Sequence, residues 1–304
     1  MFTRRNYFRF LSTIVFVIIF SSISFSQETL NKEKSPKLSG LYLGQKPPGF
    51  TPEIFAPGIV STENHEYGIS FSPNGKEIFF TRKRKGEMAQ KIMYTFEDKD
   101  GWRIPIVAPF SGQYADMEPC ISPDGTKVYF VSFRPVPGDE GITADIWISE
   151  KINGKWDEAK HLGFPFNPEK SMYFSFTHEG TMYTTDAANR GGILKARLIN
   201  GKYSEFEKLG APINTGSEAH PYVASDESYL IFDSFAGSAG PGLYVSFRNA
   251  KSEWSQPISM KRLTGEGGVA MVSPDGKYLF YTNKGDIYWI DAKIIEELRP
   301  EELK

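Results

Sequence analysis

Acidic side chains stand just ahead of several short apolar segments in this chain, and three of them are candidates for acid and base chemistry: Glu66, Glu118 and Glu218. Two carboxylates on either side of a glycosidic bond can act as general acid and as base or nucleophile. His220, two residues after Glu218, offers an alternative proton donor, and Glu218 and His220 are also candidate metal ligands. A carboxylate at such a position can equally bond a neighbouring backbone, so the catalytic role stays open.

Further polar side chains at related positions extend the candidates from chemistry to ligand binding. Carboxylates and tyrosines form hydrogen bonds with hydroxyl groups, and arginines form paired hydrogen bonds with acidic groups. The candidate ligand-binding residues are Glu66, Tyr67, Arg84, Asp116, Glu118, Arg134, Tyr173, Asp186, Arg190, Glu218, His220 and Asp233. These residue types predict a polar ligand, such as a carbohydrate, if they meet in space.

Internal repeats bring these residues to equivalent places. The segment 71–81, which contains Ser-Pro-Asn-Gly-Lys and then an apolar, aromatic run, returns at 121–131 and at 272–282 with Asp in place of Asn. Two less regular copies occupy 176–183 and 223–232. Successive copies are separated by 50, 55, 47 and 49 residues. A period of this size indicates one supersecondary unit per repeat.

Each unit is predicted to contain four antiparallel strands. A short apolar strand runs into an Asp-Gly or Asn-Gly turn, and the second strand is rich in β-branched and aromatic residues, as at 78–80 and 279–281. A third strand follows, and an aromatic residue opens the fourth: Trp102, Trp156, Phe206 or Trp254. Four strands in about 50 residues, repeated, are typical of a β-propeller blade.

The blade count follows from the two ends of the repeat region. The fifth unit lacks a fourth strand, because a charged, helix-like segment follows Asp291. A strand-like segment at 53–60 precedes the first unit and supplies the missing strand. The sequence therefore predicts an all-β, five-bladed propeller whose ring is closed by the N-terminal strand, which protects the edges. A six-bladed ring is the alternative.

The repeated Ser-Pro-Asp-Gly-Lys phrase followed by an apolar, aromatic strand resembles the repeat of the TolB-like, WD-repeat-like β-propeller family, over residues 50–292. The resemblance implies the propeller fold. It implies little about function, since that family mixes periplasmic scaffolds, peptide and protein binders and carbohydrate-active enzymes. The third and fourth copies depart from the pattern, with His178 and Ser225 in place of the proline.

Composition excludes several classes of protein. The chain of 304 residues carries 35 Lys and Arg against 37 Asp and Glu, a formal net charge of −2, which offers no basic excess for nucleic acid. The single cysteine, Cys120, excludes a disulfide framework and is expected to be a small core residue. No cofactor is predicted, and a monomer is expected.

The first residues have the composition of a secretory signal. Arg4, Arg5 and Arg9 precede an apolar stretch at 10–20, which is shorter than the roughly 20 residues that a membrane span needs. The predicted organisation is a signal peptide at 1–26, a linker at 27–49, the propeller at 50–293 and a tail at 294–304. An uncleaved anchor is the alternative, and in both cases the domain lies outside the cytoplasm, in the periplasm or secreted.

The functional prediction is non-catalytic recognition of a protein or a small polar ligand at the mouth of the propeller channel. The alternative is a carbohydrate-active hydrolase or lyase that uses the acidic rim of that channel. A purely structural envelope protein is the third hypothesis.

Overall fold

The computed structural model describes residues 38–136, 138, 143–167 and 171–303. The predicted signal peptide at 1–26 lies outside the described residues, as do residues 27–37 of the predicted linker. No helix in the described part of the chain has the length and hydrophobicity needed to span a bilayer.

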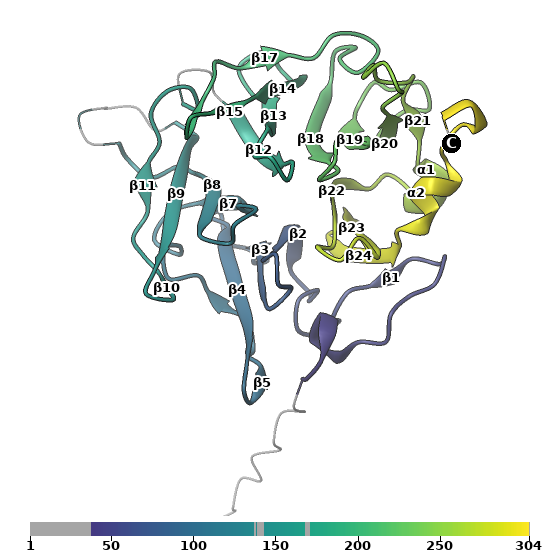
Figure 1. Ribbon diagram of the computed structural model, residues 1–304. Helices are drawn as coiled ribbons and strands as arrows, with labels where there is room; N and C mark the ends of the chain where they lie inside the picture. The colour runs from purple at the N-terminus through teal and green to yellow at the C-terminus, as the bar shows by residue number, and fades with distance from the viewer. Residues whose placement is uncertain (1–37, 137, 139–142, 168–170, 304) are drawn as a thin grey trace, which may run out of the picture. The chain divides into compact units, whose positions relative to one another are not determined.

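The strands form five antiparallel blades around a central axis, as the sequence predicts (Figure 1). Blade 1 contains β2 (His65–Phe71), β3 (Glu77–Lys83), β4 (Lys91–Asp98) and β6 (Ile106–Val107); blade 2 contains β7 (Asp116–Ile121), β8 (Lys127–Ser132), β9 (Asp145–Ile152) and β11 (Lys160–His161). Blade 3 contains β12 (Ser171–Phe176), β13 (Met182–Asp186), β14 (Ile193–Ala196) and β17 (Glu207–Lys208); blade 4 contains β18 (Glu218–Val223), β19 (Tyr229–Ser234), β20 (Gly242–Phe247) and β21 (Ile258–Ser259).

Blade 5 contains β22 (Gly268–Val272), β23 (Tyr278–Asn283), β24 (Asp286–Asp291) and the N-terminal strand β1 (Glu53–Ile54). Glu53 pairs with Trp289 and Ile54 with Tyr288, so the prediction that an N-terminal strand closes the ring is confirmed. The backbone N–H of Phe55 continues the contact with a 2.8 Å hydrogen bond to the carbonyl of Ile287.

Short strands and helical segments occur in addition to the main strands of the blades. Strands β5 (Gly101–Trp102) and β10 (Lys155–Trp156) extend β4 and β9, and β15 (Leu198–Ile199) pairs with β16 (Lys202–Tyr203). The helical segments are η1 (Leu41–Gly44), α1 (Lys261–Thr264), α2 (Lys293–Glu297) and η2 (Glu301–Leu303).

The turn between the first two strands of a blade is held by a serine in the three regular copies. In blade 1 the Ser72 hydroxyl donates to Asn74 Oδ1 at 2.7 Å and accepts from the Glu77 N–H at 2.9 Å. Gly75 in this turn has a φ of 68°, a left-handed conformation in which glycine lacks the Cβ clash. In blade 4 this position is Glu227, with a φ of 58°. The blade 3 turn is one residue shorter, with the Thr181 N–H bonded to Thr177 Oγ1.

The core lies between blades rather than within one layer. Five clusters of buried side chains occupy the five interfaces between neighbouring blades. Between blades 5 and 1, for example, Phe55, Phe280 and Trp289 pack with Tyr42 of η1. The first strand of each blade lies nearest the central axis (Figure 1).

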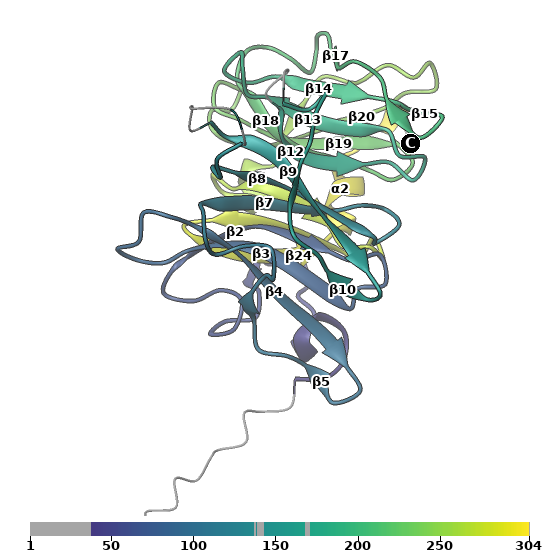
Figure 2. The same cartoon turned by 90° about the vertical axis from the view of Figure 1, so that its left-hand side faces the viewer.

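The ring has two faces, which carry different features. The first strands begin at the face that we call the entry face, and the turns that follow them lie on the opposite face, the turn face. The hairpin elements β5 and β10 lie on one side of the ring (Figure 2). They belong to the turn face, since β4 ends next to the start of β3, where Asp98 pairs with Gly101 and Glu77 with Phe96.

Candidate functional site

Each of the five first strands carries a β-bulge near its start, where the pairing with the second strand shifts register. One residue of each bulge has a left-handed backbone, with φ between 49° and 60°: Gly68, Glu118, Tyr173, His220 and Val269. A bulge redirects a side chain, and such positions are common beside functional sites. Four of these residues are not glycine. A left-handed backbone costs a non-glycine residue about 1–2 kcal/mol, so the fold holds these four in an unfavourable conformation.

The bulges fix the alignment of the last repeat. The blade 5 equivalent of Glu66, Asp116, Ser171 and Glu218 is Gly267, two residues before the bulged Val269. Glu266, one residue earlier, forms an ion pair with Lys261 at 3.1 Å.

Side chains of the preceding blade fix the bulges. The N–H of Glu118 donates to Thr81 Oγ1 and the N–H of His220 donates to Thr185 Oγ1, both at 2.8 Å. The equivalent of these threonines in blade 4 is Asp233, whose Oδ1 accepts from the N–H of Val269 at 3.2 Å. Asp233 therefore puts a carboxylate where the other blades have a neutral side chain.

That carboxylate meets His220. The Nδ1 atom of His220 lies 2.9 Å from Asp233 Oδ1, and its Nε2 atom lies 3.5 Å from Glu118 Oε1. The side chains are deeply buried, with exposed fractions of 16% for His220, 9% for Asp233 and 5% for Glu118. Burial lowers the pKa of His220, but the Asp233 and Glu118 carboxylates outweigh burial and hold this pKa well above its usual value. The raised pKa favours the imidazolium form, in which each ring nitrogen carries a proton and donates.

Tyr173 completes this group, which we call the axial cluster: Glu118, Tyr173, His220 and Asp233. The Tyr173 ring meets the His220 ring edge-on, with centroids 5.2 Å apart, and its hydroxyl donates to the carbonyl of Ala270 at 2.9 Å. Burial raises the pKa of Tyr173 well above its usual value, so the phenol stays neutral. The other carboxylate oxygen of Glu118, Oε2, is buried and has no hydrogen-bond partner among the residues that the structure describes.

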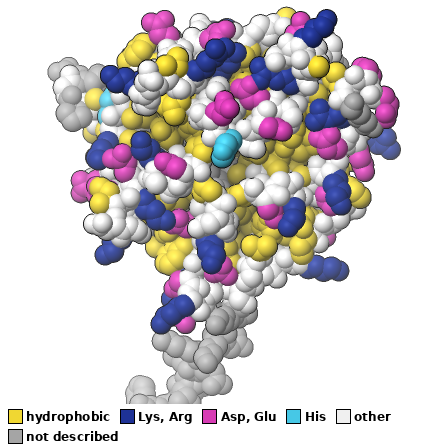
Figure 3. Space-filling model, viewed as in Figure 1, with side chains coloured by type: hydrophobic (Ala, Val, Ile, Leu, Met, Phe, Trp, Pro, Cys, Tyr) yellow, Lys and Arg dark blue, Asp and Glu magenta, His cyan; other side chains and the backbone are white. Residues whose placement is uncertain are grey.

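A cavity of about 330 Å³ lies on the axis beside the cluster and is open at the turn face. We call it the axial cavity. Its wall is mostly apolar and comes from all five blades: Ile69, Ser70, Phe71, Pro73, Pro119, Cys120, Ile121, Ser122, Pro123, Tyr173, Phe174, Ser175, Phe176, Thr177, His178, Tyr222, Ser225, Met271, Val272 and Pro274. Figure 3 views this face and shows hydrophobic side chains and a histidine near its middle, with charged side chains around them. Tyr173 belongs to both the cavity wall and the cluster.

The carboxylates at the starts of the first strands form hydrogen bonds with residues of their own blades. Glu66 accepts hydrogen bonds from Thr62 and, at 2.6 Å, from Arg82 Nε. Asp116 accepts from Ser111, Ser132 and Arg134. Both carboxylates are fully buried. Each one anchors the loop that leads into its strand.

Glu218 follows the same pattern in blade 4. It accepts from the Thr215 hydroxyl at 2.6 Å and from the N–H groups of Gly216 and Ser217. Burial raises the pKa of Glu218, but these hydrogen bonds outweigh burial and lower it below its usual value. Its carboxylate is thus bound within its own loop, whereas His220 faces Asp233 and Glu118. Among the described residues no group of three or more His, Cys, Asp or Glu could hold a metal ion.

The remaining sequence candidates have other surroundings. Arg84 is on an exposed loop with Glu87 at 3.8 Å, and Arg190 is exposed. Asp186 accepts from the Asn189 N–H and from Lys208. Tyr67 is near the axial cluster: burial and then the Glu118 carboxylate raise its pKa.

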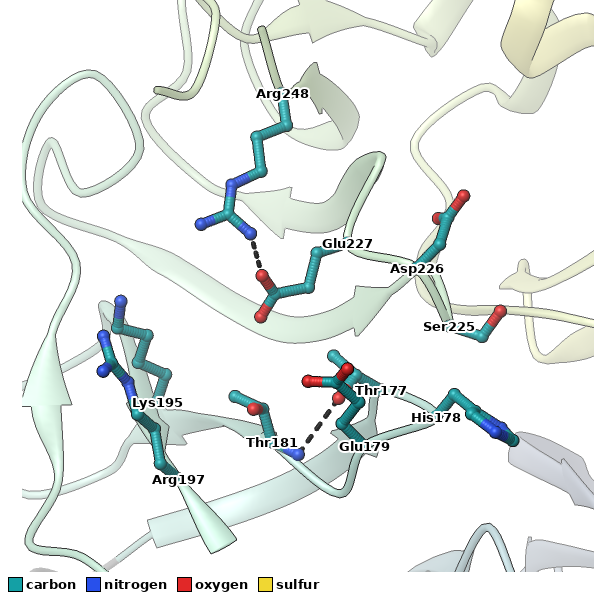
Figure 4. A pocket seen from close by; sticks show the side chains of 10 residues that line it. All are labelled: Thr177, His178, Glu179, Thr181, Lys195, Arg197, Ser225, Asp226, Glu227 and Arg248. Atoms are coloured by element: carbon teal, nitrogen blue, oxygen red, sulfur yellow. Dashed lines mark hydrogen bonds and ion pairs between the residues drawn. The ribbon is translucent and has the colours of Figure 1, made fainter. Parts of the chain in front are cut away.

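Sequence reasoning missed two features of the turn face. One is the axial cavity. The other is a groove of about 850 Å³ between blades 3 and 4, in which Arg248 points toward Glu227 (Figure 4). The Tyr183 hydroxyl donates to Glu227 at 3.0 Å. The signal for the groove was present in the sequence, because Glu227 stands where the regular turns have glycine.

Comparisons with known proteins find no family model and no curated protein that matches the chain. Among solved structures it is similar to a putative TolB from Agrobacterium tumefaciens, with 13% identity, a TM-score of 0.46, and 72% of this chain and 69% of that one covered. TolB from Acinetobacter baumannii gives 14% identity and 0.47, covering 77% and 53%, and an arabinanase from Bacillus subtilis gives 11% and 0.47, covering 75% and 94%. Similarity at this level concerns the fold alone.

Proposed function

We propose that this protein is an exported, non-catalytic binding protein that holds a small ligand in the axial cavity. The observation that carries the proposal is the cavity itself, with a mostly apolar wall from all five blades that includes Tyr173, whose ring contacts His220. Ligand sites in proteins commonly combine an apolar concave wall of roughly 300–1,000 Å³ with a few polar groups that fix orientation. Export rests on the basic and then apolar sequence of residues 4–20.

The state of the three candidate catalytic glutamates favours binding over a hydrolase or lyase. A glycosidase needs two carboxyl groups that face its substrate, one of them with a raised pKa. Glu66 and Glu218 instead accept hydrogen bonds from their own loops, and the pKa of Glu218 is lowered. Glu118 is not part of the described wall of the axial cavity, and its neighbour is His220 rather than a second carboxylate that faces a substrate.

Cys120 provides the test, since it lines the cavity and is the single cysteine of the chain. The rate at which methyl methanethiosulfonate modifies Cys120 is measured with and without benzyl alcohol, a probe that fits an apolar cavity. We expect the probe to slow the modification and to raise the melting temperature, because it binds only the folded protein.

The control is a cysteine outside the cavity. In a Cys120→Ser background, Met88→Cys places a thiol at a position that is 95% exposed on the loop after β3. Benzyl alcohol should leave its modification rate unchanged. If neither the Cys120 rate nor the melting temperature responds to the probe, the cavity does not bind small apolar molecules and the proposal fails.

A further inference from the structure

The wall of the axial cavity offers no counter-charge to a ligand. Among the described residues that line it there is no Asp, Glu, Lys or Arg, and its histidine, His178, is exposed at the turn face. A charged ligand group would leave water for this wall without meeting an opposite charge, which is costly. The wall therefore favours a ligand without a net charge.

One residue from each blade contributes to a ring of side chains around this cavity. Each of the five follows the bulged residue of its first strand by two positions and pairs with the second strand of its own blade. We call them the inner ring: Ser70, Cys120, Ser175, Tyr222 and Met271. Three of these five side chains carry a hydroxyl group, although most of the wall is apolar.

Two serines of the inner ring carry a hydroxyl whose hydrogen has no acceptor. The Ser70 Oγ atom accepts from the N–H of Ile121 at 3.0 Å, and the Ser175 Oγ atom accepts from the N–H of Val223 at 3.1 Å. Within the part of the chain that the structure describes, neither hydroxyl donates a hydrogen bond in return. Both residues are 6% exposed. A buried hydroxyl that lines a cavity without an acceptor calls for one from a ligand.

A third serine of the wall, Ser122, shows the contrast. Its hydroxyl donates to Asp124 Oδ1 at 2.5 Å and accepts from the Lys127 N–H at 3.0 Å, so the turn uses it fully. The Ser70 and Ser175 oxygens are instead held in place by an N–H of the next blade. Their O–H groups stay free to turn toward a ligand.

We infer that the ligand of the axial cavity is a neutral, largely apolar molecule with a carbonyl group, such as a ketone or an ester, that accepts a hydrogen bond from a serine hydroxyl of the inner ring. This inference rests on the proposed function, since it names the class of ligand for the same cavity. The apolar body of the ligand contacts wall residues such as Ile69, Phe174 and Met271.

The test uses acetophenone and ethylbenzene, which have nearly the same shape and differ in one carbonyl oxygen. Calorimetry with the wild-type protein measures both affinities, and infrared spectroscopy measures the C=O stretching band of bound acetophenone. We expect both probes to bind, and the band to lie at a lower frequency than in cyclohexane, because a donated hydrogen bond weakens the C=O bond. Benzoate, a charged analogue, should bind more weakly than acetophenone.

Serine variants locate the donor. When Ser70→Ala and Ser175→Ala are combined, the ratio of acetophenone affinity to ethylbenzene affinity should fall about three- to tenfold, the effect of losing one neutral hydrogen bond. The single variants show which serine donates. Ser246→Ala is the matched control, because it removes a fully buried hydroxyl that lies outside the cavity wall and donates to the Ser255 carbonyl. It should leave the ratio unchanged.

The outcomes separate this inference from the proposed function. If ethylbenzene binds but the acetophenone band lies where it does in cyclohexane, the cavity is a binding site and the carbonyl inference fails. It also fails if the combined variant keeps the wild-type ratio, or if benzoate binds more tightly than acetophenone. If no probe binds, the proposed function fails as well. The wild-type infrared band decides the matter even if the serine variants do not fold.

Discussion

Asp233 Oδ1, on the second strand of blade 4, lies 2.9 Å from His220 Nδ1, on the first strand of the same blade. The same carboxylate accepts from the N–H of Val269, so it links blade 4 to blade 5. Glu118 faces the other side of the imidazole from blade 2. Proton binding by His220 is therefore coupled to contacts among three blades.

This coupling predicts how stability depends on pH. Because the pKa of His220 is raised in the folded state by Asp233 and Glu118, its contribution is complete below the unfolded value of about 6.5 and is lost as pH rises toward the folded value. The difference in unfolding free energy between wild type and His220→Asn should fall by about 1.4 kcal/mol per pH unit above that point. Denaturant unfolding at a series of pH values measures it.

The control for this series is His178→Asn, which changes an exposed histidine of the turn face. Its effect should be small at every pH. The groups that face His220 are Asp233, Glu118 and the neutral Tyr173 phenol. A wild-type minus His220→Asn difference that stays constant from acid to alkaline pH would contradict the charged state assigned to the imidazole.

The loop-anchoring role of Glu66 predicts a large cost for removing its partner. Arg82 is 12% exposed, donates to Glu66 and also to the carbonyls of Ile59 and Val60. Arg82→Met leaves a buried carboxylate uncompensated, which should destabilise the fold by about 3–5 kcal/mol. Arg103→Met, at an exposed pair with Asp98, should have a much smaller effect in the same denaturation experiment. Equal effects would refute the anchoring role.

Closure of the ring predicts that replacing two phenylalanines near β1 by alanine changes the unfolding free energy by different amounts. Phe55 is fully buried between Phe280 and Trp289, whereas Phe50 is 53% exposed. Phe55→Ala should cost about 3–5 kcal/mol in unfolding free energy, because it removes the aromatic side chain from a close-packed interface. Phe50→Ala should cost far less. A Phe55→Ala variant as stable as Phe50→Ala would mean that the N-terminal strand is not part of the ring's core.

The left-handed backbone at Gly75 predicts that a substitution there changes stability through backbone conformation alone. A Cβ atom added at Gly75 meets nothing within 4 Å, so Gly75→Ala should cost about 1–2 kcal/mol through conformation alone. Gly49 is equally open but lacks a left-handed φ, so Gly49→Ala should be close to neutral. Thermal melting of the pair measures the difference. Indistinguishable melting temperatures would remove the argument that Glu227 adopts its conformation at a cost.

The fold could be predicted because its determinants are local. A serine, an Asn or Asp and a glycine build the same turn wherever they recur, so the copies at Ser72 and Ser273 could be aligned by eye. The missing strand of blade 5 could be inferred because a propeller leaves no edge open. Sequence also named every member of the axial cluster as a candidate.

Sequence did not reveal which candidates meet. The bulges turn Glu118 and His220 toward each other across the axis, and a bulge depends on one unpaired residue that no composition signal marks. Asp233 joins them only because a second-strand position contacts the next blade's bulge. The Glu66 and Asp116 carboxylates looked equally available, and only their arginine partners in space show that they are engaged.

Blade 5 joins segments that are very far apart along the chain. Ser61 and Ile287, which exchange hydrogen bonds beside β1, are separated by 226 positions. During synthesis β1 leaves the ribosome long before β24, the strand against which it pairs. The ring therefore cannot close until nearly the whole domain has been made, and contacts of this sequence separation are slow to form. Until then Phe55 and the other apolar side chains that flank β1 in the closed ring stay uncovered.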